Sequence, residues 1–230
     1  MGRVFLAGDP PVPITLRKSH RAQRVSLRVS SLDGRVTLSI PDGMDEAVAL
    51  AFAEQKSDWI KRHLAKQDTP VIVGFGQPVL YRGEEVPVAQ GRGQRALWDG
   101  AAIRVPGGPA MAGARVKAFL KLDAKARLQE AVARYSAMLG RRVGKITLRD
   151  TRSRWGSCTA SGNLMFSWRL AMAPDAALDY VAAHEVAHLV ELNHSPAYWR
   201  VVQDICPGFE APRQWLKTQG FRLHRYRFGD

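Results

Sequence analysis

The segment HEVAHLVELNHSPAYW, residues 184–199, contains three of the chain's six histidines and an acid directly beside the first of them. His184 and His188 are four residues apart, so on a helix their imidazoles project from one face, about one turn apart, and can share a metal ion. Glu185 is displaced by about 100° around the helix axis. It can therefore reach a water molecule on that ion without binding the ion itself.

This HExxH spacing leaves three interpretations open. It is the arrangement of zinc peptidases, in which the acid serves as a general base. It could instead belong to a metal site that only stabilises a fold, or to an ordinary helix that carries histidines. The carboxylate beside the first histidine favours the catalytic interpretation, because a structural zinc site has no use for it.

A catalytic zinc ion needs a third protein ligand, and the sequence offers two candidates. His194 follows a segment that we expect to turn: Asn193 suits the left-handed conformation that ends helices, and Ser195 suits the N-cap of a new helix. Glu191 is the other candidate. A continuing helix would place it about 4.5 Å further along the helix axis than His188, where its side chain could contact a metal-binding histidine better than the metal ion itself. We predict His194 as the third ligand and zinc as the metal, since imidazoles plus a water form its usual catalytic set.

The elements that must position these residues are predicted from apolar periodicity. A buried stripe between Val116 and Leu139 indicates one long helix. Residues 145–158 and 163–173 are expected to form two strands joined by the turn residues TASG. Pro174 and Asp175 then open a second helix that should run through the first two histidines to about Leu192.

The preceding part of the chain is expected to form a separate, β-rich region. Alternating runs at 24–30 and 35–40, around the turn signal LDGR (32–35), predict a hairpin, and residues 44–67 predict one helix. Short strand-like pieces follow, and VPGGPAMAG (105–113) is the expected linker. We therefore predict an α+β protein with a β-rich region at 1–111, which contains one helix, and a catalytic region at 112–230.

Composition and charge set the wider expectations. The chain has 230 residues and two isolated cysteines, which indicates a reducing compartment, and no stretch long and apolar enough for a membrane span, so we expect a cytoplasmic protein. Residues 112–154 carry 12 basic and 3 acidic side chains, so this block supplies most of the chain's net charge of +13. A basic block of this kind is most often a solvated helix face, but Lys117, Lys121 and Lys125 fall four apart and could attract nucleic acid.

Several motifs together resemble one family. WGSC (155–158), NLMFSWRL, APDAALDYVAAHEVAHL and NHSPAYW are similar to the YgjP-like metallopeptidases, which are related to the SprT-like proteases of the zincin group. The resemblance implies a zincin-like catalytic region with ligands His184, His188 and His194 and with Glu185 as acid/base. The metzincin pattern HExxHxxGxxH has a glycine where this chain has Glu191, so membership of that branch is not expected.

The leading hypothesis is thus a zinc-dependent peptidase that acts on polypeptides, with an edge strand of the 146–172 region as a docking site for extended substrate. Tyr198 and His224 are candidate oxyanion donors, although Tyr198 fits a core aromatic better. The alternative is a nucleic-acid-binding protein whose structural zinc is closed by Cys158 or Cys206. A third hypothesis combines the two, as a protease recruited to DNA-bound proteins.

Overall fold

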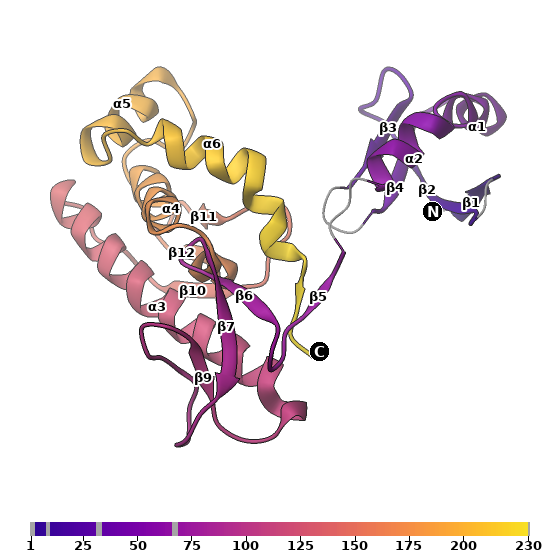
Figure 1. Ribbon diagram of the computed structural model, residues 1–230. Coiled ribbons are helices and arrows are strands. Elements are labelled where there is room, and N and C mark those ends of the chain that lie inside the picture. The colour runs from indigo at the N-terminus through magenta and orange to yellow at the C-terminus, as the bar shows by residue number, and fades with distance from the viewer. Residues whose placement is uncertain (1–2, 8–9, 31–33, 66–68, 230) are drawn as a thin grey trace. The chain divides into compact units, whose positions relative to one another are not determined.

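The computed structural model of the chain describes residues 3–7, 10–30, 34–65 and 69–229. The chain divides into two compact units, Met1–Thr69 and Pro70–Asp230, and most of their helices and strands are labelled in Figure 1. Helices and strands occur in both units, so the mixed α+β class is confirmed. No helix in the described ranges is long and apolar enough to cross a membrane.

The first unit is a four-stranded sheet covered by two helices. Its strands are β1 (Arg3–Leu6), β2 (Val12–Ser19), β3 (Ser26–Val29) and β4 (Val36–Pro41), in the order β1-β2-β4-β3. The predicted hairpin is present as the antiparallel pair β3 and β4, while Leu32 and Asp33 of its turn lie outside the described residues. Alternate residues of β2 and β4 face the core, as the period of two in the sequence requires.

The single helix predicted at 44–67 is wrong in one respect, because the structure contains two helices there. α1 (Glu46–Gln55) and α2 (Ser57–Ala65) meet at Lys56, whose φ of −97° and ψ of 10° depart from helical values, and residues 66 and 67 lie outside the described part. Ala53 before this turn and Ile60 after it are both fully buried in one cluster with the sheet. The turn therefore lets both helices contribute to that core.

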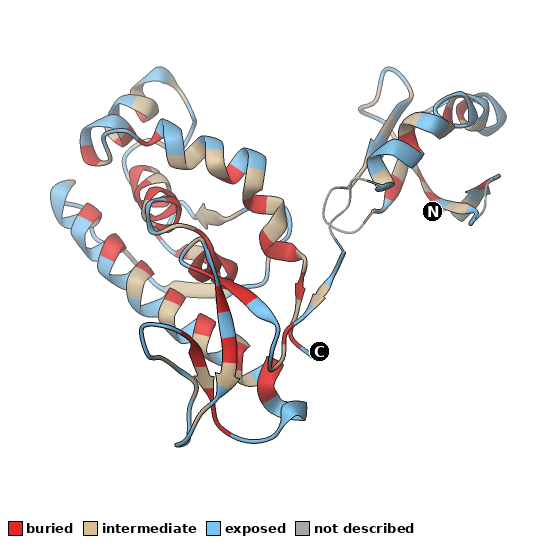
Figure 2. Cartoon of the chain, in the orientation of Figure 1, coloured by how far each residue is buried: buried red, intermediate tan, exposed pale blue. Residues whose placement is uncertain are grey.

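The second unit begins with a four-stranded sheet that packs against the long helix α3 (Ala112–Met138). The strands are β6 (Pro78–Tyr81), β7 (Glu84–Gln90), β8 (Leu97–Trp98) and β9 (Ile103–Val105), in the order β6-β7-β9-β8. Val88 and Ile103 of this sheet share a core with Val116 and Leu120 of the helix. In Figure 2 the buried residues along α3 and along these strands are red. Beside them, β5 (Val71–Ile72) pairs with β13 (Tyr226–Arg227).

The boundary between the two units lies between residues 69 and 70 and not, as predicted, between residues 111 and 112. Residues 70–111 were expected to belong with the N-terminal region, but their apolar side chains are buried against α3 and belong to the second unit. The expected linker at 105–113 is instead the end of β9, the short 3-10 helix η1 (Pro109–Met111) and the start of α3. Gly113 sits where a Cβ atom would lie 2.7 Å from the carbonyl oxygen of Phe228, so the glycine allows the C-terminal segment to pass close to α3.

The rest of this unit surrounds a three-stranded sheet. Its strands are β10 (Ile146–Arg149), β11 (Gly156–Cys158) and β12 (Leu164–Ser167), in the order β10-β12-β11. They are followed by the 3-10 helix η2 (Trp168–Met172), by α4 (Asp175–Ala187), α5 (Pro196–Ile205) and α6 (Glu210–Gln219), and by the 3-10 helix η3 (Gly220–His224). α4 lies between α3 and α6 in Figure 1 and packs against both.

The strand predicted at 145–158 is therefore wrong as a single element. β11 pairs antiparallel with β12 as a hairpin, whereas β10 pairs parallel with the other edge of β12. The segment between them leaves the sheet because Asp150 binds the buried Arg169 with two hydrogen bonds, of 2.7 and 3.1 Å. As a result β11 is an edge strand that runs beside α4.

Candidate metal centre

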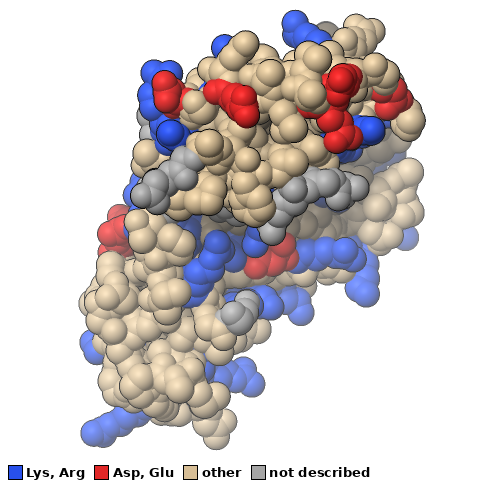
Figure 3. Space-filling model, turned by 90° about the vertical axis from the view of Figure 1, so that its right-hand side faces the viewer, with Lys and Arg blue, Asp and Glu red and all other residues tan. Residues whose placement is uncertain are grey.

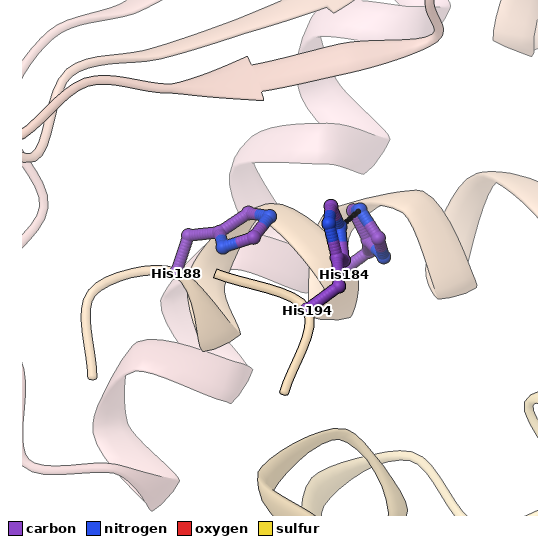
Figure 4. A group of neighbouring side chains, drawn as sticks. All are labelled: His184, His188 and His194. Atoms are coloured by element: carbon purple, nitrogen blue, oxygen red, sulfur yellow. Dashed lines mark hydrogen bonds between the residues drawn. The ribbon is translucent and has the colours of Figure 1, made fainter. Parts of the chain in front are cut away.

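His184, His188 and His194 lie together, as Figure 4 shows, with one ring nitrogen of each within 4.8 Å of the others. The Nε2 atoms of His184 and His194 are 3.2 Å apart. Two nitrogen ligands of a tetrahedral zinc ion, each about 2.0–2.1 Å from it, are separated by about 3.3 Å. The three-imidazole donor set and the spacing of His184 and His194 therefore fit a zinc ion, and the ring of His188 points toward the same region.

The early end of α4 makes this geometry possible, and it differs from the prediction. The helix stops at Ala187, with His188 as its C-cap, and does not continue to Leu192. The amides of Leu189 and Val190 then bond back to Val186 and Ala187 in tight turns. The chain reverses within a few residues, which carries His194 back toward the helix.

The start of the next helix was predicted correctly, but the conformation of the residue before the turn was not. Ser195 is the N-cap of α5 and accepts a hydrogen bond from the amide of Tyr198 at 3.3 Å. Asn193 does not adopt the predicted left-handed conformation, which would give it a positive φ. Among the described residues other than glycine, Arg82 alone has a positive φ. Asn193 instead uses its side-chain oxygen to accept a bond from the amide of Ser195 at 3.0 Å, which makes the turn by another route.

Hydrogen bonds orient two of the three imidazoles. Nδ1 of His188 donates to the backbone carbonyl of Glu191 at 2.9 Å, which leaves Nε2 free to bind an ion. Nδ1 of His184 lies 3.3 Å from the hydroxyl of Tyr180. The Glu191 carboxylate is not part of the cluster, so this residue contacts a histidine through its main chain. Tyr180 was not singled out from the sequence, although its position four residues before His184 puts it on the same face of the helix.

The surroundings keep the half-buried imidazoles of His184 and His188 neutral. Burial, followed by the nearby charges of His188 and His194, lowers the pKa of His184 to about 3. Burial also lowers the pKa of His188. Neutral imidazole is the form that binds a metal ion, so these two side chains need not lose a proton first at neutral pH.

Glu185 is buried beside the cluster, with 4% of its surface exposed. Burial raises the pKa of its carboxyl group to about 8, against the opposing charge of Arg154. The carboxylate packs on Gly156, where a Cβ atom would lie only 2.4 Å from Oε1. A carboxyl group in such a position can accept and return a proton near neutral pH.

A cleft of about 330 Å³ opens beside this carboxylate, and we call it the Glu185 cleft. One wall is formed by Tyr180, Val181, His184 and Glu185 of α4. The remaining lining comes from residues 154–156 and from the side of α6 that carries Arg213, Leu216 and Lys217.

Both candidate oxyanion donors lie in the interior. Tyr198 is fully buried, stacks on the ring of His188 with centroids 4.5 Å apart, and donates its hydroxyl to the carbonyl of His184 at 2.9 Å. His224 is buried with its ring centroid 5.3 Å from that of Trp155, and burial lowers its pKa to about 4. The Glu185 cleft is lined by neither residue.

The basic block at 112–154 is partly neutralised by acidic side chains, one inside the block and two on α4. Arg127 pairs with Asp123 at 3.0 Å and with Asp175 at 2.6 Å, and Arg134 pairs with Asp179. Figure 3, which shows one face of the molecule, contains both basic and acidic side chains, with most of the acidic ones in its upper part. These pairs agree with a solvated helix face, and no contact of the described residues supports a nucleic-acid partner.

Comparison with known proteins identifies a family. The model of the YgjP-like family, described as a metallopeptidase domain, matches residues 23–219. Among curated proteins, none matches the chain. Among solved structures, the chain is similar to the metallopeptidase zymogen abylysin of Pyrococcus abyssi, with 21% identity and a TM-score of 0.36 over 40% of this chain and 95% of that chain. A similarity at that level supports no inference about this chain.

Proposed function

The chain belongs to the YgjP-like metallopeptidase family, and from this premise we propose that it hydrolyses peptide bonds with a zinc ion bound by His184, His188 and His194. Membership of the family implies a metal ion and a polypeptide substrate. The observation that carries the proposal is the cluster of three imidazoles with the buried carboxylate of Glu185 next to it. The zincin-like arrangement of helix, hairpin and HExxH helix within residues 112–230 is part of the same proposal.

Glu185 is the general acid/base in this proposal. A bound zinc ion supplies Lewis-acid assistance to the attacking water and to the scissile carbonyl. The Glu185 carboxylate takes the proton that the water loses and gives it to the nitrogen of the leaving amine. Its burial supports this role, because a pKa near neutrality matches both the uptake and the release of the proton.

Other residues act by position. The hydroxyl of Tyr180 and the carbonyl of Glu191 hold the rings of His184 and His188, so that their Nε2 atoms remain available for the ion. Gly156 leaves room for the Glu185 carboxylate at the start of β11. Since β11 is an edge strand, we propose that an extended substrate pairs with it and passes beside Glu185.

The structural-zinc alternative receives less support. It needs a fourth protein ligand, and neither Cys158 nor Cys206 belongs to the cluster formed by the described residues. Such a site would also leave the buried Glu185 without a role. Recruitment of a protease to DNA-bound proteins stays a hypothesis that depends on nucleic-acid binding.

The test combines metal content, cleavage and thermal melting on the full chain. The purified protein should contain one zinc ion and cleave an unfolded protein substrate; chelation should stop cleavage, and added zinc should restore it. Activity that survives complete removal of the metal would contradict the proposal. An inactive protein that unfolds when zinc is removed would support the structural-zinc alternative.

A further inference from the structure

The Glu185 cleft is lined by three cationic side chains. Arg154 lies beside β11, and Arg213 and Lys217 lie on α6 one turn apart. None of the three forms an ion pair with a carboxylate among the described residues. The acid that lines the cleft is Glu185 itself, which the proposed function already uses.

Arg213 is held in place more firmly than an ordinary surface arginine. Its guanidinium carbon lies 4.2 Å from the centroid of the Trp199 ring, and that ring in turn stacks on Phe209 with an interplanar angle of 15°. A guanidinium stacked in this way keeps its N–H groups free to bind a carboxylate in the plane of the group. Arg154 and Lys217 are more exposed and add positive charge at the mouth of the cleft.

The chemistry of the site indicates which part of a substrate enters this cleft. In the proposed reaction Glu185 gives its proton to the nitrogen of the leaving amine, so that nitrogen must lie within hydrogen-bond reach of the carboxylate. The residue that carries this nitrogen is the first one after the scissile bond. Because Glu185 lines the cleft, the part of the substrate closest to the cleft is the side chain of this first residue or, at a chain end, its terminal group.

We infer that the Glu185 cleft binds a carboxylate on the leaving-group side of the scissile bond, with Arg213 as its main partner and with Arg154 and Lys217 at the mouth. This inference rests on the proposed function. Two sources can supply the group: an acidic side chain directly after the scissile bond, or the free carboxylate of a chain end. The cleft volume of about 330 Å³ admits either one.

The experiment measures cleavage of matched peptides by the zinc-loaded full chain, with cut positions identified by mass spectrometry. One pair carries Glu or Gln after the scissile bond and has an amidated end. In the second pair the residue after the scissile bond is Gln, which is also the last residue. Its carboxyl group is free in one peptide and amidated in the other. We expect the carboxylate in at least one pair to raise kcat/KM about tenfold at low salt, and less at high salt. The pair that shows the effect identifies the source.

Matched variants test the assignment to these residues. Arg213→Gln and Lys217→Gln should each reduce the preference to about threefold or less, where the preference is the ratio of kcat/KM for the acidic and the neutral peptide of a pair measured with the same variant. Arg200→Gln removes one charge from an exposed position on α5 outside the cleft and should leave the preference unchanged. Thermal melting of each variant verifies that it folds. Cleavage of all peptides at equal rates, or a preference that survives both cleft variants, would overturn the inference while leaving the proposed function intact.

A binding measurement separates the inference from catalysis. Titration of the protein with the tripeptide amides Glu-Ala-Ala and Gln-Ala-Ala, which resemble the leaving product, should show about tenfold tighter binding of the first. Arg213→Gln should remove that difference. If no peptide is cleaved but the acidic tripeptide still binds through Arg213, the proposed function fails and the carboxylate site stands. If an oligonucleotide binds through Arg213 and neither carboxylate source does, the cleft recognises phosphates and the inference is wrong.

Discussion

The Cα atom of Gly156 lies against the side chain of Glu185, so that a Cβ atom at position 156 would be 2.4 Å from Oε1 and 2.6 Å from Cγ of the acid. Contacts this short do not occur between real atoms, so any side chain at 156 must displace the carboxylate. β11 and α4 can approach each other closely only with glycine there. The position of the proposed general base is therefore set by a residue in a different element.

Gly156→Ala should accordingly reduce activity without removing the metal. The added methyl group shifts the Glu185 carboxylate by about 1 Å, a misplacement that can cost about 10²-fold in rate, while the three histidines keep their positions. Zinc content and kcat/KM measured on the same preparation provide the comparison. Ser157→Ala, one residue further along β11, is the matched control and should retain most of the activity. Loss of zinc in Gly156→Ala would contradict this account.

Glu185→Gln should abolish peptidase activity and leave both fold and zinc content unchanged. Glutamine has nearly the same size and can still hydrogen-bond to water, but it cannot accept the water's proton. The loss of a general acid/base costs about 10²- to 10⁴-fold in rate. Cleavage of an unfolded protein substrate, thermal melting and metal analysis give the three readouts. A Gln variant with nearly normal turnover would exclude Glu185 as the acid/base.

His194→Ala should lower zinc affinity much more than Glu191→Ala. The first change removes a nitrogen that lies 3.2 Å from Nε2 of His184, whereas the second leaves in place the backbone carbonyl that accepts the hydrogen bond from His188. Competition with a chelator of known affinity measures both variants. Equal losses, or a larger loss for Glu191→Ala, would show that the ligand assignment is wrong.

Asp150→Asn should destabilise the second unit by about 2 kcal/mol, because it leaves the buried guanidinium of Arg169 with a neutral partner. Burial raises the pKa of Asp150, but the hydrogen bonds and charge of Arg169 outweigh it, and the net pKa lies below the usual value. The carboxylate therefore stabilises the fold above its unfolded pKa of about 4, and this contribution disappears as pH falls through the folded pKa. Urea unfolding of wild type and Asp150→Asn should show a difference at pH 7 that shrinks in acid. A difference that is independent of pH would contradict the ion-pair explanation.

Nucleic-acid binding through the block at 112–154 stays a prediction. If Lys117, Lys121 and Lys125 contact phosphates, affinity for DNA or RNA should fall steeply as salt rises, and replacing all three with glutamate should reduce that slope. Glutamate at exposed positions outside the block, such as Arg92, provides the control. Absence of binding at low salt would leave the block as a solvated helix face.

The sequence by itself predicted the family, the grouping of the three histidines and most of the local elements. The spacing of His184 and His188 followed from the helical repeat, the N-cap at Ser195 from its side chain, and the family from motifs close together in the chain. Each of these depends on residues within a few positions of one another. For the same reason the long helix α3 and the β3–β4 hairpin were predicted correctly.

Only the tertiary structure decided what depends on distant residues. The break between β10 and β11 follows from the bond between Asp150 and Arg169, and the assignment of residues 70–111 to the second unit follows from packing on α3. The contact of Gly156 with Glu185 and the meeting of Arg154 with Arg213 in one cleft join elements that are 29 and 59 positions apart. Local propensity carries no information about such pairs, because burial against a partner surface, rather than the neighbouring residues, determines which side chains meet.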